Sequence, residues 1–365
     1  MIRISINTNS GNYDALIENG LLRSSGSYIR ELLPEGKKYF IVTVPPVRKF
    51  WGKPVDDAFS DAGLDHQFIE LQDGERHKNL KTIEDLCGKL VKLGADRGSV
   101  VVALGGGVIG DMSGFAASIY MRGIRFLQVP TTFLAQIDSS VGGKTGVNLT
   151  EGKNLIGTFN QPELVLIDPQ TLQTLPDREF RSGLFEALKA GIIRSPRIFS
   201  FMEENRERIL ARDLASLEWL IAECVRVKGA VVSEDERENG IRRILNLGHT
   251  MGHALESETG YKHFLHGEAV GWGIVAAAMI SVGMQKTTPE IAQRIISAIL
   301  AYGTLPKVEV RPRSVLRRLT SDKKTVDGKV HFILPTEVGR VEIVNNVPEK
   351  AVLQAVEELR YLSQA

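Results

Sequence analysis

The chain has 365 residues, a formal net charge of +1 at pH 7, 43% hydrophobic residues and 24% charged residues. This length exceeds that of a single hydrophobic core, so we expect two domains of ordinary globular composition. The balanced charge provides no basic surface for nucleic acid or for an anionic membrane, so we expect neither as a partner.

The first half of the chain alternates short apolar runs with helical patterns. Ile2, Ile4 and Ile6 alternate as in a strand, and no signal-peptide apolar region is present. Further strands are expected at Tyr39–Val44, Gln67–Leu71, Val100–Leu104, Phe126–Val129 and Leu164–Ile167, and helices at Leu80–Leu93 and Gly110–Ile119. This alternation is typical of βαβ units, so we predict an α/β N-terminal domain, residues 1–170, with a mostly parallel sheet.

After Pro176 helical patterns dominate. They cover Arg178–Arg194, Asp213–Val232, Thr250–Thr259, Gly267–Met284 and Pro289–Leu300, followed by a small hairpin at Gly328–Leu334 and Arg340–Val344 and a last helix at Glu349–Leu362. We therefore predict a mainly α-helical C-terminal domain, residues 171–365. Its most apolar run, Ala269–Met284, is short for a membrane span and is interpreted as a buried core helix.

The two cysteines, Cys87 and Cys224, are far apart in the sequence and cannot form a disulfide framework. Such sparse cysteine usage is typical of proteins in a reducing compartment. We therefore expect the protein to be cytoplasmic.

A glycine-rich turn joins the strand Val100–Leu104 to the next helix. The run Gly105-Gly-Gly-Val-Ile-Gly-Asp111 satisfies G-x-G-x-x-G, in which glycines allow close backbone approach and a helix N-terminus binds pyrophosphate. The acidic residue usually found about 20 positions further on is missing, and Asp111 follows the last glycine instead. We predict a non-standard nucleotide site, and a tight turn without a ligand is the alternative.

Two further segments could complete a dinucleotide site. The run Asp73-Gly-Glu-Arg-His-Lys78 follows a predicted strand and offers carboxylates for ribose hydroxyls and a lysine for phosphate. Thr131 and Thr132 end another predicted strand, at the sheet edge where open α/β folds bind ligands.

A glycine-rich segment with two lysines runs from Asp138 to Asn154. Its Gly-Lys144-Thr triplet resembles a P-loop, but Asp138 stands where that motif needs glycine, which excludes the P-loop. Lys144, Lys153 and Asn154 could bind a phosphate from a loop. A plain flexible loop is an equal alternative.

Four of the seven histidines lie between His249 and His266. Histidine is the commonest metal ligand, and His249 and His253 share one helix face because they are four residues apart. A threonine replaces the glutamate of the zinc-protease motif H-E-x-x-H, which excludes that class. His266 could join either histidine, with Glu186 as an oxygen ligand, whereas His263 is a weaker candidate. The spacing leaves open whether His249 or His253 is the ligand.

These motifs together resemble the 3-dehydroquinate synthase family of sugar phosphate cyclases. The resemblance covers nearly the whole chain and rests on long strings: DGERHK, GGGVIGD, YMRG, QVPTTFLAQIDSSVGGKTGVN, GKNLIGTF, SGLFEALKAGII, DERENGIRRILNLGHTMGHALE, FLHGEAVGWG and a late DKK. It implies that NAD and a divalent metal, usually zinc or cobalt, are cofactors, and that the C-terminal domain binds the metal.

The resemblance also implies which residues bind the cofactors. Glu186, His249 and His266 would hold the metal, which leaves His253 for the substrate. The implied NAD site comprises Asp73, Gly74, Glu75, Lys78, Gly106, Gly107, Val108, Ile109, Gly110, Asp111, Thr131, Thr132, Lys144, Lys153, Thr171, Leu172 and Thr174.

The implied substrate is a phosphorylated sugar acid, 3-deoxy-D-arabino-heptulosonate 7-phosphate. Its phosphate would be bound by Lys144, Asn154, His253, Lys323 and, from the partner subunit of a homodimer, Arg122. Its carboxylate would be bound by Lys228 and Arg242, and its hydroxyls would lie near Asp138, Lys189, Glu238 and Asn246. The implied reaction comprises transient oxidation with NAD, phosphate elimination, re-reduction, ring opening and an intramolecular aldol closure to 3-dehydroquinate.

Two other classes of enzyme share parts of this pattern. Cyclases that make inosose or valiolone products act on substrates without a carboxylate, and we do not expect them to keep Arg242, Asn246 and His253 together. A metal-dependent polyol dehydrogenase would need no set of lysines and arginines for two anions. One departure from the family is Thr43-Val-Pro-Pro46, where a polar residue toward the adenosine is common.

Overall fold

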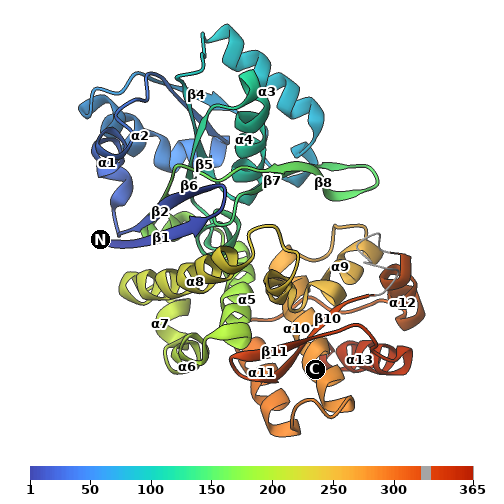
Figure 1. Ribbon diagram of the computed structural model, residues 1–365. Coiled ribbons are helices and arrows are strands. Elements are labelled where there is room, and N and C mark those ends of the chain that lie inside the picture. Colours follow the sequence, from blue (N-terminus) through green and yellow to red (C-terminus); the bar gives the residue numbers. More distant parts are fainter. Residues whose placement is uncertain (322–329, 365) are drawn as a thin grey trace. The chain divides into compact units, whose positions relative to one another are not determined.

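The computed structural model in Figure 1 describes residues 1–321 and 330–364. The chain forms two compact units, Met1–Pro176 with Leu214–Arg237, and Asp177–Asp213 with Glu238–Ala365. The sequence-based division after residue 170 differs from these units. Helix α8 (Leu214–Glu234), which that division gives to the second domain, packs on strand β1 (Ile2–Thr8) of the first unit.

The first unit contains a seven-stranded sheet with the order β1-β2-β9-β6-β5-β3-β4. Its remaining strands are β2 (Gly11–Ile17), β3 (Tyr39–Thr43), β4 (His66–Glu70), β5 (Val100–Gly105), β6 (Arg125–Pro130) and β9 (Leu164–Ile167). The helices between them are α1 (Ser25–Leu32), α2 (Pro45–Asp61), α3 (Leu80–Lys92) and α4 (Gly107–Ile119). Only β1 and β2 pair antiparallel within this sheet, so the predicted mostly parallel α/β sheet is confirmed.

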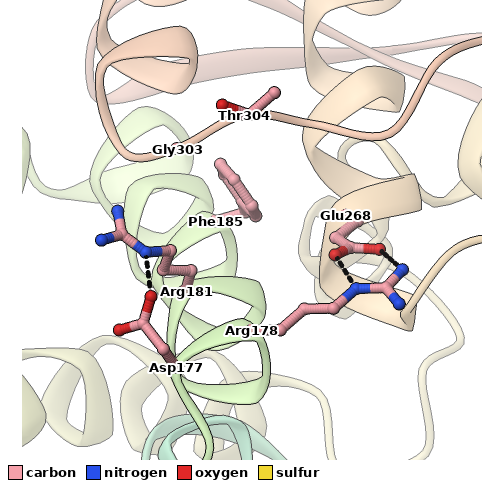
Figure 2. Close-up of a pocket in the computed structure, with 7 residues that line it drawn as sticks. All are labelled: Asp177, Arg178, Arg181, Phe185, Glu268, Gly303 and Thr304. Carbon is pink, nitrogen blue, oxygen red and sulfur yellow. Dashed lines mark hydrogen bonds and ion pairs between the residues drawn. The ribbon is translucent and has the colours of Figure 1, made fainter.

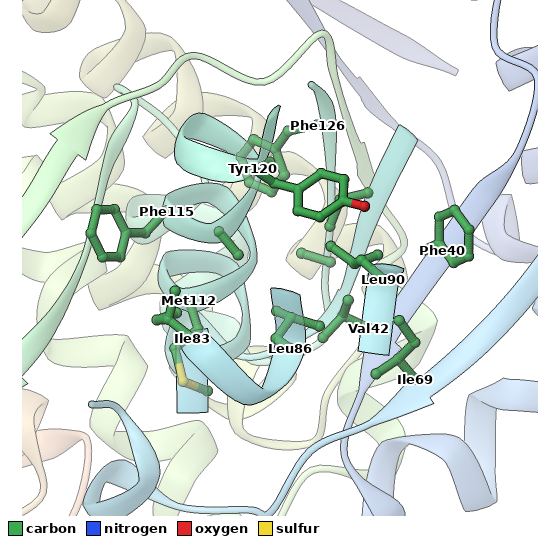
Figure 3. Packing of buried hydrophobic residues seen from close by; sticks show 14 of the residues in the cluster. Phe40, Val42, Ile69, Ile83, Leu86, Leu90, Met112, Phe115, Tyr120 and Phe126 are labelled. Carbon is green, nitrogen blue, oxygen red and sulfur yellow. The ribbon is translucent and has the colours of Figure 1, made fainter. Parts of the chain in front are cut away.

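The central strands bury apolar side chains on both faces. In β3, Phe40 and Val42 pack with helices α3 and α4, as Figure 3 shows. Tyr39 and Ile41 face the other way and pack with α1 and α2. Burying one such side chain stabilises the fold by about 1.5–3 kcal/mol. This double burial explains why the strands are continuous apolar runs. It also fixes the carboxyl end of β5, from which the glycine-rich turn starts, beside the carboxyl end of β6.

Pro45 and Pro46, which depart from the family pattern, begin α2, because a proline at the first helical position loses no hydrogen bond. One local prediction for this unit was wrong. The predicted glycine-rich loop from Asp138 contains the paired strands β7 (Lys144–Leu149) and β8 (Gly152–Phe159). Its glycines permit this pairing, since a Cβ on Gly157 would overlap the carbonyl oxygen of Thr145.

The second unit is mainly helical, as predicted. Its elements are α5 (Asp177–Arg194), α6 (Pro196–Glu204), α7 (Arg206–Leu210), α9 (His249–Glu258), α10 (His266–Gly283), α11 (Pro289–Ala301), α12 (Pro312–Ser321), α13 (Glu349–Leu362) and a hairpin of β10 (Phe332–Glu337) and β11 (Arg340–Val344). The apolar helix α10 is almost wholly buried and packs against α5, α9, α11, α13 and β10. The expected start of the hairpin, residues 328–329, lies outside the described residues.

Within the described part of the chain, no helix has the length and apolar character needed to cross a membrane.

Candidate functional site

The N-terminus of α4 in the first unit lies in a tightly packed, glycine-rich turn. The turn contains Gly106, the N-cap residue, and Gly107, the first helical residue. A Cβ on Gly106 would lie 2.9 Å from Thr132 Cγ2, and one on Gly107 would lie 2.9 Å from Ser139 Oγ. The glycines therefore let the turn lie against these two neighbours. The free N–H groups and the dipole of a helix N-terminus favour an anion there.

A buried lysine connects three of the predicted segments. Lys78 is 4% exposed, and its ammonium forms an ion pair with Asp111 and donates to Asn154 Oδ1. Burial raises the pKa of the Asp111 carboxyl, and the charge of Lys78 acts in the opposite direction. Asn148 donates to Glu75 Oε1 at 2.7 Å and accepts from the Asn154 N–H at 2.9 Å. The structure thus brings Glu75, Lys78, Asp111 and Asn154 together.

The predicted threonines have different surroundings. The Thr131 hydroxyl is buried and has no hydrogen-bond partner among the described residues, whereas Thr132 Oγ1 accepts from the Ala135 N–H at 3.3 Å. Thr171 Oγ1 accepts from Gln136 at 2.9 Å, and Thr174 Oγ1 accepts from the Trp51 indole N–H at 2.9 Å. Thr131 therefore has a buried hydroxyl whose hydrogen-bonding capacity the described residues do not use.

Other predicted residues of this unit lie on its loops and on α8. Lys228 of α8 forms an ion pair with the Asp138 carboxylate and also donates to the Asp138 carbonyl oxygen. Asp73 lies on an exposed loop, Lys144 is the exposed first residue of β7, and Arg122 is exposed with a φ of 68°. The structure therefore brings Lys228 and Asp138 together before any substrate is bound.

In the second unit, a carboxylate and two imidazoles converge from three helices. Glu186 of α5 is 2% exposed, and its Oε1 lies 3.6 Å from His249 Nε2 of α9 and 3.5 Å from His266 Nε2 of α10. Their ligand atoms lie within 4.8 Å of one another, so they could hold one metal ion. Lys189, one helical turn after Glu186, forms an ion pair with its other oxygen. One carboxylate and two imidazoles are the donor set of a catalytic zinc site with an open position.

The two histidines of this group differ in their protonation. Burial lowers the pKa of His249 to about 4, and the positive charge of Lys189 acts in the same direction. Burial also acts to lower the pKa of His266, but hydrogen bonds with Glu186 and Glu256 outweigh it and raise the value to about 9. At pH 7 His249 is therefore ready to bind a metal, whereas His266 must first release a proton.

A residue that the sequence analysis missed lies beside this group. Glu256 is 2% exposed, and its Oε2 lies 3.4 Å from His266 Nδ1. Within the described residues, His253, Glu256 and His266 form a second group able to hold a metal. The available signal was the spacing, because Glu256 follows His253 by three residues and His249 by seven, on one helix face.

The segment between α8 and α9 contains three more predicted residues, Glu238, Arg242 and Asn246. Arg242 is 1% exposed, and Asn246 donates to Glu238 Oε1 at 2.7 Å. His263 belongs to neither metal group, and its Nε2 lies 2.9 Å from the Lys307 carbonyl oxygen. Lys323 lies outside the described residues.

Comparisons with known proteins place these sites in a family. Residues 68–182 match the description "3-dehydroquinate synthase N-terminal" and residues 183–325 match "3-dehydroquinate synthase C-terminal". The 3-dehydroquinate synthase of Koribacter versatilis is 57% identical over 363 residues, which cover 100% of this chain and 99% of the relative.

Two solved structures have the same fold. A 2-deoxy-scyllo-inosose synthase complexed with carbaglucose-6-phosphate, NAD+ and Co2+ has a TM-score of 0.89 and 28% identity, covering 98% of this chain and 99% of that chain. A 2-epi-5-epi-valiolone synthase from Streptomyces hygroscopicus with NAD+ and Zn2+ bound has a TM-score of 0.88 and 26% identity, covering 99% of this chain and 100% of that chain. The fold is thus that of the sugar phosphate cyclases. Within this class, the chain belongs to the 3-dehydroquinate synthase family.

Proposed function

We propose that the protein is a carbon–oxygen lyase that converts 3-deoxy-D-arabino-heptulosonate 7-phosphate into 3-dehydroquinate and phosphate. The observation that carries this proposal is the Glu186, His249 and His266 group in a chain 57% identical, over its whole length, to a 3-dehydroquinate synthase. A polyol dehydrogenase could also use such a metal group, but the full-length identity favours the cyclase.

The metal site would be formed by Glu186, His249 and His266 with Zn2+ or Co2+. Two related solved structures are described with one or the other of these ions. When bound, a divalent metal polarises a substrate oxygen as a Lewis acid. The ion pair with Lys189 holds the Glu186 carboxylate on α5 before the metal arrives, so the site needs little rearrangement.

The first unit would bind NAD, which accepts a hydride and returns it within one turnover. The pyrophosphate would lie at the N-terminus of α4, where free N–H groups and the helix dipole favour an anion. The other proposed contacts are Asp73, Gly74, Glu75, Lys78, Val108, Ile109, Gly110, Asp111, Thr131, Thr132, Lys144, Lys153, Thr171, Leu172 and Thr174. The links of Lys78 with Asp111 and of Glu75 with Asn148 support this assignment, since they hold the polar groups in place.

The substrate carries a phosphate and a carboxylate, so it needs two groups of cationic residues. We assign Lys144, Asn154, His253, Lys323 and the partner's Arg122 to the phosphate, Lys228 and Arg242 to the carboxylate, and Asp138, Lys189, Glu238 and Asn246 to the hydroxyls. The Lys228–Asp138 ion pair and the Asn246–Glu238 hydrogen bond support this assignment. Side chains that are fixed before binding lose less entropy when the substrate arrives.

We further propose a cytoplasmic homodimer in which Arg122 reaches the site of the second subunit. Arg122 is exposed and, like Met121 and Gly123 beside it, has a positive φ, and the nearby apolar side chains of Ile119 and Met121 are 45% and 42% exposed. Exposed apolar side chains around a charged residue suit a protein interface. Neither Cys87 nor Cys224 forms a disulfide among the described residues, which supports a reducing compartment.

The test is release of phosphate from the heptulosonate substrate with catalytic NAD+ and added Zn2+ or Co2+. The proposal predicts stoichiometric phosphate and 3-dehydroquinate without net NADH. Net NADH formation on a polyol, with no phosphate released from the heptulosonate, would instead identify a polyol dehydrogenase. Turnover of a phosphorylated sugar without a carboxylate, in preference to the heptulosonate, would identify a different cyclase.

A further inference from the structure

One face of α5 carries Arg178, Ser182 and Glu186, which are four residues apart and contact the first turn of α10. Arg178 donates to both carboxylate oxygens of Glu268, from Nε at 2.7 Å and from Nη2 at 2.8 Å (Figure 2). Ser182 Oγ accepts from the Gly267 N–H at 3.1 Å. The third contact in this series joins Glu186 to His266, the first residue of α10.

The Arg178–Glu268 pair fixes the chain on both sides of His266. Glu268 Oε2 accepts from the Leu265 N–H at 2.8 Å, which caps the start of α10. Arg178 Nη2 also donates to the His263 carbonyl oxygen at 3.0 Å. The residues before and after His266 are therefore held by the same guanidinium and carboxylate.

The two helices leave almost no space between them at this point. A Cβ on Gly267 would overlap the carbonyl oxygen of Ser182 and would lie 2.7 Å from its Oγ. Because α10 begins at His266, any shift of its first turn along α5 moves the imidazole relative to Glu186. Metal sites are sensitive to such shifts, since ligand distances vary by only about 0.2 Å in good sites.

We infer that Arg178 is a positioning residue for the metal: together with Glu268 it holds His266 at the distance from Glu186 that the metal requires. This inference rests on the proposed metal site. Arg178 acts through other residues and has no contact with the metal group itself. Its loss leaves Glu268, which is 5% exposed, without its guanidinium partner, and the first turn of α10 keeps only the Ser182 and Glu186 contacts with α5.

The chain offers a matched control in Arg181. Both arginines line the same cavity of about 400 Å³, with Asp177, Phe185, Glu268, Gly303 and Thr304 (Figure 2). Arg181 donates to Asp177 and to the Tyr302 carbonyl oxygen, and it has no hydrogen bond with the first turn of α10. Arg178→Ala and Arg181→Ala therefore remove the same type of side chain from the same cavity wall, and only the first removes a contact between α5 and the first turn of α10.

The experiment measures the Zn2+ affinity of the folded, metal-stripped proteins against a chromophoric chelator, and the visible spectrum of bound Co2+. Arg178→Ala should weaken Zn2+ binding about tenfold or more and change the Co2+ spectrum, whereas Arg181→Ala should stay within about twofold. Arg178→Lys should fall between Arg178→Ala and the natural protein, because lysine restores the charge without the paired donors. Excess metal should restore most of the activity of Arg178→Ala.

Equal Zn2+ affinities and Co2+ spectra for Arg178→Ala and Arg181→Ala would overturn the inference. If Arg178→Ala does not fold, Glu268→Gln and Arg178→Lys provide the same comparison with smaller changes. Failure of the proposed metal site is a separate result: the natural protein would then bind no Zn2+, or His266→Ala would bind it with unchanged affinity.

Discussion

Glu256 approaches His266 from the side opposite to Glu186: its Oε2 lies 3.4 Å from the Nδ1 of His266, whereas Nε2 of the same ring lies 3.5 Å from Glu186. A carboxylate at this position fixes the tautomer and the orientation of a metal-binding imidazole. Glu256 therefore orients a ligand of the proposed metal site, although it is not one of the three ligands itself.

Replacing Glu256 tests this role. We expect Glu256→Leu to lower the Zn2+ affinity about 10- to 100-fold, and Glu256→Gln to have a smaller effect because its carbonyl oxygen still accepts from Nδ1. Calorimetric titration of the metal-stripped protein measures both. Glu258→Gln is the matched control, since Glu258 lies on the same helix and pairs with Arg318 at 3.1 Å. A Glu256→Leu variant with the affinity of this control would refute the role.

The affinity for metal should also depend on pH. The pKa of His266 is raised to about 9, and that of His249 is lowered to about 4, so His266 carries the proton that a metal must displace at neutral pH. The apparent Zn2+ affinity should therefore rise about tenfold per pH unit from roughly pH 6 to 9 and then level off. Calorimetry at pH 7.5 in buffers of different ionisation enthalpy should detect about one proton released per metal. Binding without proton release would contradict the assignment.

The four clustered histidines should respond differently to replacement. His266→Ala and His249→Ala remove a direct ligand, so we expect losses of Zn2+ affinity beyond about a hundredfold, the upper range for residues that only support a ligand. His253→Ala should retain the metal and weaken phosphate release, because its proposed contact is the substrate. His263→Ala should change neither, since its ring bonds to the Lys307 carbonyl oxygen. Metal content after dialysis measures the first effect, and a phosphate assay measures the second.

The central sheet could be predicted from the sequence because strands that are buried on both faces need apolar residues at nearly every position. Strands such as β3 and β5 are covered on both faces, which leaves continuous β-branched and aromatic residues in the sequence. The association of α8 with the first unit could not be predicted, because it depends on packing against β1, far away in the sequence. Local patterns carry no information about which distant surface a helix will cover.

Residues of the candidate metal site could be predicted from the sequence where their residue type is rare in the chain. Histidines are rare in this chain, so their clustering indicated His249 and His266, whereas the resemblance to the family was needed to choose His249 over His253. Glu256 was missed because a glutamate on a helix is normally a solvated surface residue, and its sequence neighbours do not reveal that it is buried.

The glycines of the nucleotide turn provide a last prediction. Gly107 lies in an ordinary helical conformation, so alanine is allowed by the backbone, but its Cβ would lie 2.9 Å from Ser139 Oγ, so Ser139 or the first turn of α4 would have to shift. We expect Gly107→Ala to weaken NAD+ binding about tenfold or more, a loss of about 1.4 kcal/mol, measured by calorimetry. Gly88→Ala is the control: Gly88 lies in α3 with nothing within 4 Å of its added Cβ. Alanine there should stabilise the fold by roughly 0.5–1 kcal/mol in chemical denaturation and leave NAD+ binding unchanged. If Gly107→Ala binds NAD+ as tightly as Gly88→Ala, the pyrophosphate does not lie at this helix N-terminus.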